Sequence, residues 1–221
     1  MKKNILLLLI VFISCNKKDA VENEIPVSKT DTISKAEISY FEFTPDTLAD
    51  VKIEGFEISA AYKLDDKKIV TGYYDAVGGK LSHHDSDTNY GPRLLLLNDN
   101  NKISYTSKGA MDAFLFQPHF YKNNSNGKII IVCQLAFEYY FGGDAFLLDN
   151  GVVTPIGNLD IASLSEEESL NDILKINEIE NQLLFSFKSD SLLLEPGSKD
   201  LHVKNENLRY VFENGSLKFY K

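Results

Sequence analysis

Residues 82–93, SHHDSDTNYGPR, bring together side chains that bind metal ions in many proteins. Asp85, Asp87 and Asn89 alternate as the first three oxygen ligands of a calcium-binding loop do. Gly91 falls one place later than the glycine such a loop needs, and no glutamate stands at the twelfth position. We therefore expect a polar surface loop without a structural metal. A weak calcium site is the alternative.

The two adjacent histidines of this loop offer little for zinc. On a strand, His83 and His84 would point to opposite sides and could not bind one ion together. In a loop they could converge, but the sequence specifies no third ligand. The weak candidates for metal ligands are therefore His83, Asp85, Asp87 and Asn89. We expect no cofactor.

Two pairs of tyrosines are the best candidates for a binding patch. Tyr139 and Tyr140 lie in FEYYFGGD, and Tyr73 and Tyr74 end an earlier strand-like run. On a strand, each pair places one ring on each face, so that one ring packs inward and the other can contact a partner. Packing of both rings between two covered faces is the competing explanation.

Motifs for nucleophilic or metal-assisted catalysis are absent. The sequence contains no G-x-S-x-G, H-E-x-x-H, P-loop or C-x-x-C pattern. Cys133 lies in the apolar run IIIVCQLAF, which predicts a buried thiol rather than a reactive one. His119 and His202 are expected to be isolated or satisfied histidines. A glycosidase with paired carboxylates stays open, because its residues need only spatial proximity. We lean toward a protein that is not an enzyme.

The first nineteen residues, MKKNILLLLIVFISCNKKD, indicate secretion. Lys2 and Lys3 precede an apolar run over residues 5–13, and small residues follow it. Nine helical residues at about 1.5 Å each fall well short of a bilayer core of about 30 Å. A positive start, a short apolar run and a small residue at its end are typical of a secretory signal peptide.

Phe12-Ile13-Ser14-Cys15 resembles the lipobox of bacterial lipoproteins, although that family usually has Leu where Phe12 stands. The resemblance covers only about the first twenty residues. It implies cleavage before Cys15 and acylation of Cys15, with palmitate among the acyl chains. A single acyl chain holds a protein only marginally, so two or three chains would make membrane attachment effectively permanent.

Composition indicates one globular domain on a tether. Cleavage leaves 207 of the 221 residues and changes the formal net charge from −9 to −11, because Lys2 and Lys3 are lost. This acidic balance argues against nucleic acid as a partner. Residues 15–35 are polar and predict a flexible tether. Residues 36–221 form the domain, since the chain is 43% hydrophobic and 11% aromatic and can bury a core.

Hairpin signals predict an all-β fold. Short polar turns separate apolar, alternating runs, and Asn-Gly is the strongest signal because both residues tolerate positive φ. The expected turns are Asp65-Asp66, 98–101, 123–127, Asn150-Gly151, Glu180-Asn181 and Asn214-Gly215. We expect about a dozen strands in an antiparallel meander that forms a sandwich or a barrel-like curled sheet. The chain is short for a closed propeller.

Two elements are predicted in more detail. Residues 129–141 are expected to form one long strand that is partly covered on both faces, because apolar residues occupy both alternating positions. One short helix is expected near residues 166–174, where Ser165 and Glu168 fit a capping box and Leu170 and Ile173 follow at helical spacing.

These features together predict a membrane-anchored envelope lipoprotein that presents a non-catalytic β-domain for binding or assembly. Its partners would be the membrane, through lipid on Cys15, and an envelope protein or small ligand. Asn16 is not the Asp that retains such proteins at the inner membrane, so we expect an outer-membrane lipoprotein facing the periplasm or the cell surface. The alternatives are a metal-dependent or carboxylate hydrolase and an inhibitor or immunity-type protein.

Overall fold

The structure is a computed structural model that describes residues 37–74, 89–165 and 167–221. The chain divides into two units, residues 1–34 and 35–221, and the described residues belong to the second. The lipobox, the tether and most of the 82–93 loop lie outside the described residues.

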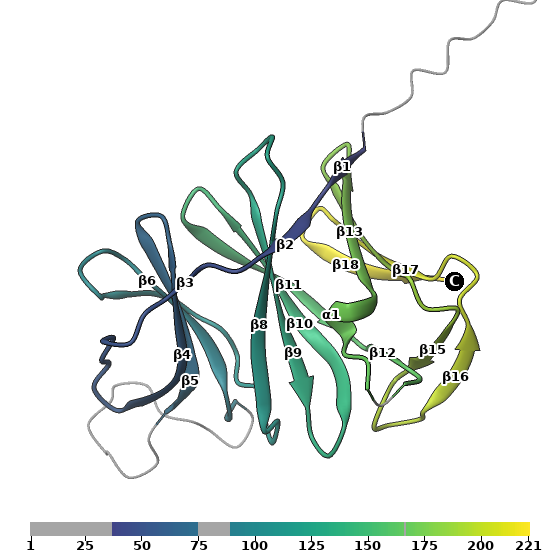
Figure 1. The fold of residues 1–221 in the computed structure, drawn as a ribbon, viewed down its shortest axis with the longest axis horizontal. Coiled ribbons are helices and arrows are strands. Elements are labelled where there is room, and N and C mark those ends of the chain that lie inside the picture. The colour runs from purple at the N-terminus through teal and green to yellow at the C-terminus, as the bar shows by residue number, and fades with distance from the viewer. Residues whose placement is uncertain (1–36, 75–88, 166) are drawn as a thin grey trace, which may run out of the picture. The chain divides into compact units, whose positions relative to one another are not determined.

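The described residues form eighteen strands and one short helix (Figure 1). The helix is α1 (Leu170–Ile173). The strands are β1 (Ile38–Ser39), β2 (Phe41–Phe43), β3 (Asp46–Thr47), β4 (Phe56–Leu64), β5 (Lys67–Tyr74), β6 (Arg93–Leu97), β7 (Ile103–Thr106), β8 (Leu115–Lys122), β9 (Ile129–Ala136), β10 (Tyr140–Asp149), β11 (Val152–Leu159), β12 (Ile161–Ser163), β13 (Leu174–Ile179), β14 (Gln182–Phe187), β15 (Ser191–Leu194), β16 (Leu201–Lys204), β17 (Arg209–Glu213) and β18 (Ser216–Tyr220).

All strand pairs of the four sheets are antiparallel, and most join neighbours in sequence. The sheet orders are β3-β4-β5-β6-β7, β11-β10-β9-β8-β2, β12-β15-β16 and β1-β13-β14-β17-β18. The all-β antiparallel meander predicted from the turn signals is therefore confirmed, although the described residues form eighteen strands rather than about a dozen. None of these sheets closes on itself, so the sandwich is the form that the described residues adopt.

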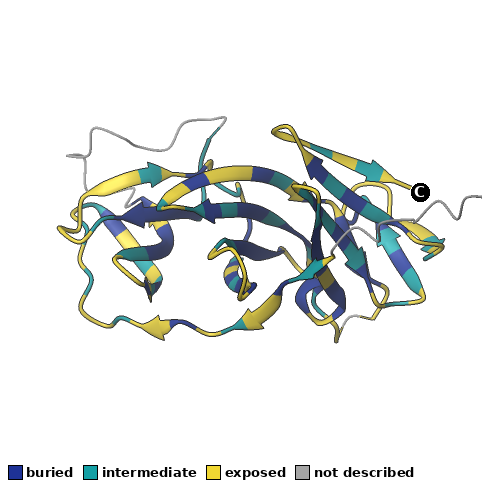
Figure 2. Cartoon of the chain, turned by 90° about the horizontal axis from the view of Figure 1, so that it is seen from above, coloured by how far each residue is buried: buried dark blue, intermediate teal, exposed yellow. Residues whose placement is uncertain are grey.

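The sheets pack in layers because the central strand β9 is apolar on both faces. Ile131 and Cys133 belong to a core shared with β5, β6 and β8. Ile130 and Val132 belong to a second core, shared with α1 and the C-terminal strands. Figure 2 shows buried positions along the inner strands and exposed positions at the turns. The prediction that this strand is covered on both sides is confirmed.

All six predicted turns connect strands. Asp65 has φ 51°, which is the left-handed conformation that the β4–β5 hairpin needs. Asn150 and Gly151 (φ 49° and 74°) and Asn214 and Gly215 (φ 51° and 74°) match the two positive values of a type I′ turn. Local turn chemistry therefore determines most of the strand boundaries.

The segment β1–β2 spans two sheets, since β1 pairs with β13 and β2 pairs with β8. Between these strands, the Tyr40 hydroxyl donates to Glu178 Oε2 at 2.7 Å. Glu178 also accepts hydrogen bonds from Asn126 Nδ2 at 2.9 Å and from Lys128 Nζ at 2.5 Å. This buried network fixes the first described strand to the rest of the unit.

The helix forms where expected but is shorter and is capped elsewhere. It spans four residues, and Ser169, not Ser165, is its N-cap. Asp172 Oδ2 accepts a hydrogen bond from the Ser169 N–H at 2.8 Å, which is one half of a capping box. The predicted capping residue Glu168 instead accepts a hydrogen bond from the Ser163 hydroxyl at 2.7 Å.

A buried network of hydrogen bonds holds α1 against β9. Gln134 Oε1 accepts a hydrogen bond from the Leu170 N–H at 2.8 Å, and its Nε2 donates to the Gly142 carbonyl at 2.9 Å. The Tyr121 hydroxyl donates to Asn171 Oδ1 at 3.0 Å. The side chain of Gln134 thereby satisfies a helix N–H that would otherwise be buried without a partner.

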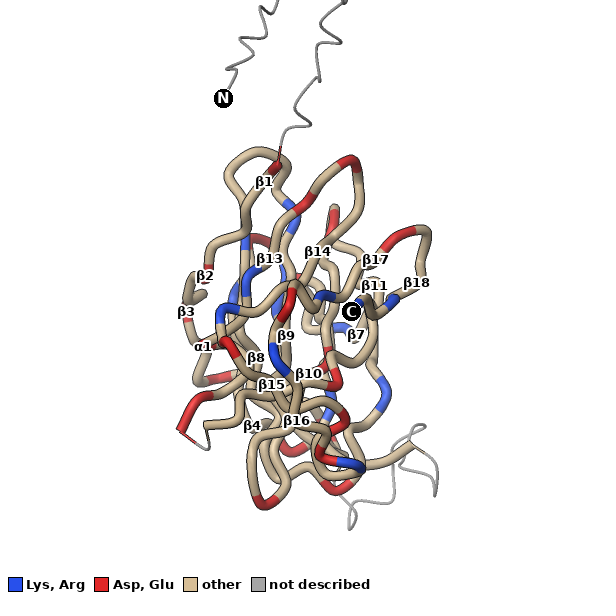
Figure 3. Tube along the Cα trace, turned by 90° about the vertical axis from the view of Figure 1, so that its right-hand side faces the viewer, with Lys and Arg blue, Asp and Glu red and all other residues tan. Residues whose placement is uncertain are grey.

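Acidic and basic positions are interspersed along the trace (Figure 3). No helix within residues 37–74, 89–165 and 167–221 is long and apolar enough to cross a membrane.

Candidate functional site

The β9–β10 turn is the first element of the candidate site, and it corrects the prediction of one long strand over residues 129–141. β9 ends at Ala136, and the chain reverses so that Tyr140 pairs with Ala136 across the new hairpin. The Phe137 N–H donates to the Tyr139 carbonyl at 3.1 Å and closes the reversal. The turn contains no Gly, Pro or Asn, so the sequence carried no turn signal at this point.

The reversal leaves aromatic rings exposed at the tip of the hairpin. Phe137, Tyr139 and Tyr140 are 37%, 44% and 37% exposed. Phe137 stacks on Phe141, with ring centroids 4.3 Å apart and planes 14° apart. Gly142 lies within β10, where a register shift between Tyr140 and Gly143 accommodates it as a bulge.

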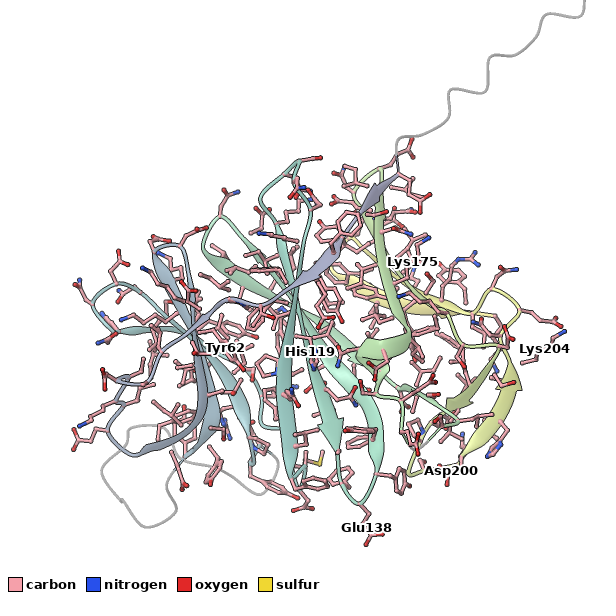
Figure 4. The ribbon with its side chains drawn as sticks, in the orientation of Figure 1. Tyr62, His119, Glu138, Lys175, Asp200 and Lys204 are labelled. Carbon is pink, nitrogen blue, oxygen red and sulfur yellow. The ribbon has the colours of Figure 1, made fainter. Side chains whose placement is uncertain are left out.

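A cavity of about 320 Å³ lies beside this tip. Tyr139 and Tyr140 line one side of the cavity. The segment after β12 contributes Leu164 and Glu168, and the β15–β16 hairpin contributes Asp200 and His202, among the lining residues. Figure 4 shows Glu138 and Asp200 on the same side of the described unit, at the lower edge of the view.

Strand alternation in the sheet β12-β15-β16 explains why His202 faces the cavity. Leu192 and Leu194 are buried in the second core, so Leu193 between them points to the opposite face. His202 pairs directly with Leu193 and therefore shares that face. Both residues line the cavity.

The tip and the β15–β16 turn approach each other closely. A Cβ built on Gly197 would lie 3.4 Å from the Tyr139 hydroxyl. Gly197 has φ +74°, and its N–H donates to Asp200 Oδ1 at 2.9 Å, which holds the turn together. The position of Tyr139 is thus defined by a turn that lies some sixty residues later in the chain.

The polar groups of the cavity combine structural hydrogen bonds with acceptor positions that are still unused. One oxygen of Glu168 accepts from Ser163, and one oxygen of Asp200 accepts from Gly197, so both carboxylates serve local structure. No group of three His, Cys, Asp or Glu side chains within the described residues is placed to hold a metal ion. Two tyrosine rings, an imidazole and the free lone pairs of the carboxylates remain for contacts with a ligand.

The other predicted pair, Tyr73 and Tyr74, lies in a different place. Tyr74 is 8% exposed, its ring packs edge-on against Phe56 at 5.4 Å, and the guanidinium of Arg93 lies 4.6 Å above it. Tyr73 is 39% exposed and lines a separate cavity of about 410 Å³. A hydrogen bond to Glu57 raises the pKa of Tyr73. The four tyrosines therefore do not form one patch.

The predicted metal loop can be placed only at its end. His83, Asp85 and Asp87 lie outside the described residues. Asn89 Oδ1 accepts a hydrogen bond from the Gly109 N–H at 2.8 Å, so this oxygen already has a structural use.

The remaining predicted residues take structural positions or fall outside the description. Cys133 is fully buried, and burial raises the pKa of its thiol well above its usual range, as expected for a core cysteine. His119 Nδ1 lies 2.8 Å from Glu42 Oε1. Cys15 lies outside the described residues.

Sequence reasoning missed Glu168, Asp200 and His202 as companions of Tyr139 and Tyr140. Residues 192–194 are three consecutive leucines, so the local sequence shows neither which face of β15 is buried nor which strand lies beside it. Comparison of the chain with protein-family models, with curated proteins and with solved structures finds no match.

Proposed function

We propose that the protein is an envelope lipoprotein, anchored through lipid on Cys15, whose β-domain binds a partner without catalysing a reaction. The partner is an envelope protein or a small ligand. The proposed location is the outer membrane, on its periplasmic or outer side. The observation that carries the binding role is the pair of exposed tyrosines, Tyr139 and Tyr140, beside an open cavity of about 320 Å³.

The aromatic character of the tip supports a binding role. Tyrosine is enriched among the residues that contribute most binding energy at interfaces, because it combines a large rigid apolar area with a hydroxyl. Large rings are costly to leave in water unless a partner covers them. Leu164, which is 40% exposed, also lines the cavity and extends the apolar surface from a neighbouring element.

The anchor proposal rests on the first nineteen residues and on the polar segment behind Cys15. Within the described unit, β1 and the β9–β10 turn lie at opposite ends (Figures 1 and 4). The aromatic tip therefore lies at the end of the described unit that is opposite β1.

A carboxylate hydrolase is the second candidate function, because Glu168, Asp200 and His202 line the same cavity. A carboxylic acid with a nearby carboxylate or imidazole is the minimum set for acid–base hydrolysis. The structural use of one oxygen of each carboxylate weighs against this candidate. An inhibitor or immunity-type role would be a special case of the binding proposal, in which the partner loses its own activity when bound.

The binding proposal is tested by capture from an envelope extract with the full chain and its single variants. Tyr139→Ala and Tyr140→Ala are expected to weaken capture by more than about 1 kcal/mol, roughly fivefold in affinity. Val152→Ala is the matched control, because Val152 is 64% exposed and does not line the cavity. Equal recovery by all three variants would contradict the proposal. Turnover of a substrate that His202→Ala abolishes would favour the hydrolase instead.

The anchor is tested separately by labelling with a fatty acid in a bacterial host. The chain contains two cysteines, Cys15 and Cys133. Cys15→Ala is expected to abolish labelling, whereas Cys133→Ala should retain it because that thiol is buried. Labelling of Cys15→Ala at the level of the unmodified chain would refute the lipid anchor.

A further inference from the structure

A further cavity, of about 350 Å³, lies between the edges of two sheets. Tyr105 and Thr106 of β7, the edge strand of one sheet, line one side. Asp144 and Phe146 of β10, with Asn158 and two other residues of β11, line the other. None of its lining residues is shared with the cavity beside the β9–β10 turn.

Local backbone geometry explains why space remains here. A register shift falls between Ala145 and Phe146, so that Ala145 pairs with Gly157 and Phe146 pairs with Pro155. The intervening Ile156 is turned into the second core. Pro155 and Gly157 line the gap between the sheets, and Gly157 contributes no side chain to it; a Cβ at Gly157 would instead approach Leu217 at 3.0 Å.

The walls of the cavity are mainly apolar and aromatic. Tyr105 and Phe146 meet edge to face, with centroids 6.5 Å apart and planes 73° apart. Both rings line the cavity together with Pro155. A volume of this size is near the lower end of the range usual for small-molecule sites.

Asp144 is the one acidic group of this cavity. Asn158, its cross-strand partner, donates from Nδ2 to Asp144 Oδ1 at 3.0 Å. The carboxylate of Asp144 forms no other hydrogen bond and no ion pair within the described residues. Burial raises the pKa of the Asp144 carboxyl, although the hydrogen bond from Asn158 opposes this rise. Asp144 is half-buried, and its carboxylate forms no salt bridge within the described residues, so it is open to a cation that enters the cavity.

We propose that this cavity binds a small organic cation, an ammonium group on an apolar body, with the ammonium paired to Asp144 and the apolar part against Tyr105 and Phe146. Charge complementarity selects the cation, since a carboxylate in an apolar site gains most from an opposite charge within about 4–6 Å. The aromatic walls add attraction, because a cation close to a tyrosine or phenylalanine ring is stabilised by its π-system.

Lys108 adds a positive charge to the lining of the cavity. Lys108 is exposed and lines the cavity, and it forms no ion pair with Asp144. Its charge repels an incoming ammonium group, so its removal should strengthen binding. This residue supplies a variant that gains affinity without disturbing a buried position.

The test measures binding of phenethylammonium to the full chain in an uncharged detergent by titration calorimetry. Phenethyl alcohol and 3-phenylpropionate are the neutral and anionic controls of similar shape. We expect saturable binding of the ammonium compound and at least tenfold weaker binding of both controls, as for loss of one charge-assisted contact. Equal binding of the alcohol, or no saturable binding of the ammonium compound at millimolar concentration, would overturn the proposal.

Three variants locate the site. Asp144→Asn should weaken binding of phenethylammonium at least tenfold, and Lys108→Glu should strengthen it. Thr106→Trp, at an exposed residue of the rim, should block the cavity with the charge intact. Thermal unfolding of each variant shows whether it is folded. If Asp144→Asn is unfolded, the other two decide: unchanged affinity in both Lys108→Glu and Thr106→Trp would overturn the assignment.

Discussion

Removing the charge of Glu178 should destabilise the fold, because Glu178 of β13 accepts the hydrogen bond of Tyr40, which lies between β1 and β2. The Glu178 side chain is 6% exposed, and that of Lys128 is 23% exposed. Loss of one partner of a buried ion pair costs about 3–5 kcal/mol, and the partial exposure of Lys128 places the expected value at the lower end. We expect Glu178→Ala to lower the free energy of unfolding by about 3 kcal/mol, because Tyr40 also loses its acceptor.

Lys128→Met should cost less, about 1–2 kcal/mol, since Tyr40 and Asn126 still donate to the carboxylate. Urea unfolding followed by circular dichroism measures both variants and the double variant, and a coupling energy of at least about 1 kcal/mol is expected for residues in direct contact. Lys199→Met is the matched control, because Lys199 belongs to an exposed pair with Glu195 and its loss should not change stability measurably. If the stability losses of Glu178→Ala and Lys128→Met simply add in the double variant, the two side chains do not stabilise each other and the reasoning is refuted.

The same carboxylate gives a pH dependence with a defined sign. Burial alone would raise the pKa of Glu178, but the hydrogen bonds from Lys128 and Tyr40 outweigh it and lower the pKa below its ordinary value of 4.5. A lowered pKa in the folded state stabilises the fold above pH 4.5, and this contribution is lost as the pH falls through the lowered value. Glu178→Gln should flatten the stability profile below pH 5. An unchanged profile would contradict this assignment.

The other predictions concern the core and the metal loop. Tyr74→Ala should lower the free energy of unfolding by about 3–5 kcal/mol, as is usual for a buried aromatic ring, whereas Tyr73→Ala should leave the melting temperature nearly unchanged; equal losses in thermal unfolding would contradict their assigned burial. Gln134→Leu should cost about 1–3 kcal/mol, because the Leu170 N–H is then buried without an acceptor, and chemical unfolding that shows no loss would refute that role. We expect no structural metal, so a chelator should leave the melting temperature of the full chain unchanged. A bound ion at a hundredfold excess over its Kd would stabilise the fold by about 2.7 kcal/mol. A large drop in melting temperature that calcium reverses would therefore reveal a site in the loop that contains Asp85 and Asp87.

Features determined by neighbouring residues could be predicted from the sequence. The turns at Asn150-Gly151 and Asn214-Gly215 follow from the tolerance of these residues for positive φ. The two covered faces of β9 follow from apolar residues at both alternating positions, with Ile130 and Ile131 in different cores. These features require no knowledge of which distant strand lies alongside.

Features determined by distant contacts could not be predicted. The reversal at Phe137 has no turn residue to indicate it, and pairing of Tyr140 with Ala136 decides it. The predicted capping box at Ser165 is not used, because the hydrogen bond from the Leu170 N–H to Gln134 places the start of the helix at Ser169. The residues that accompany the tyrosines come from the segment after β12 and from the β15–β16 hairpin, and they meet only through tertiary packing.

A photo-crosslinking residue at the hairpin tip tests the central claim most directly. Benzoylphenylalanine in place of Tyr140, in the full chain expressed in a bacterial envelope, should form a specific crosslinked product on irradiation. The same residue in place of Val152, which is more exposed but lies away from the cavity, should form none. Crosslinking from Val152 but not from Tyr140 would contradict the proposal that the tip of the β9–β10 hairpin is the binding surface.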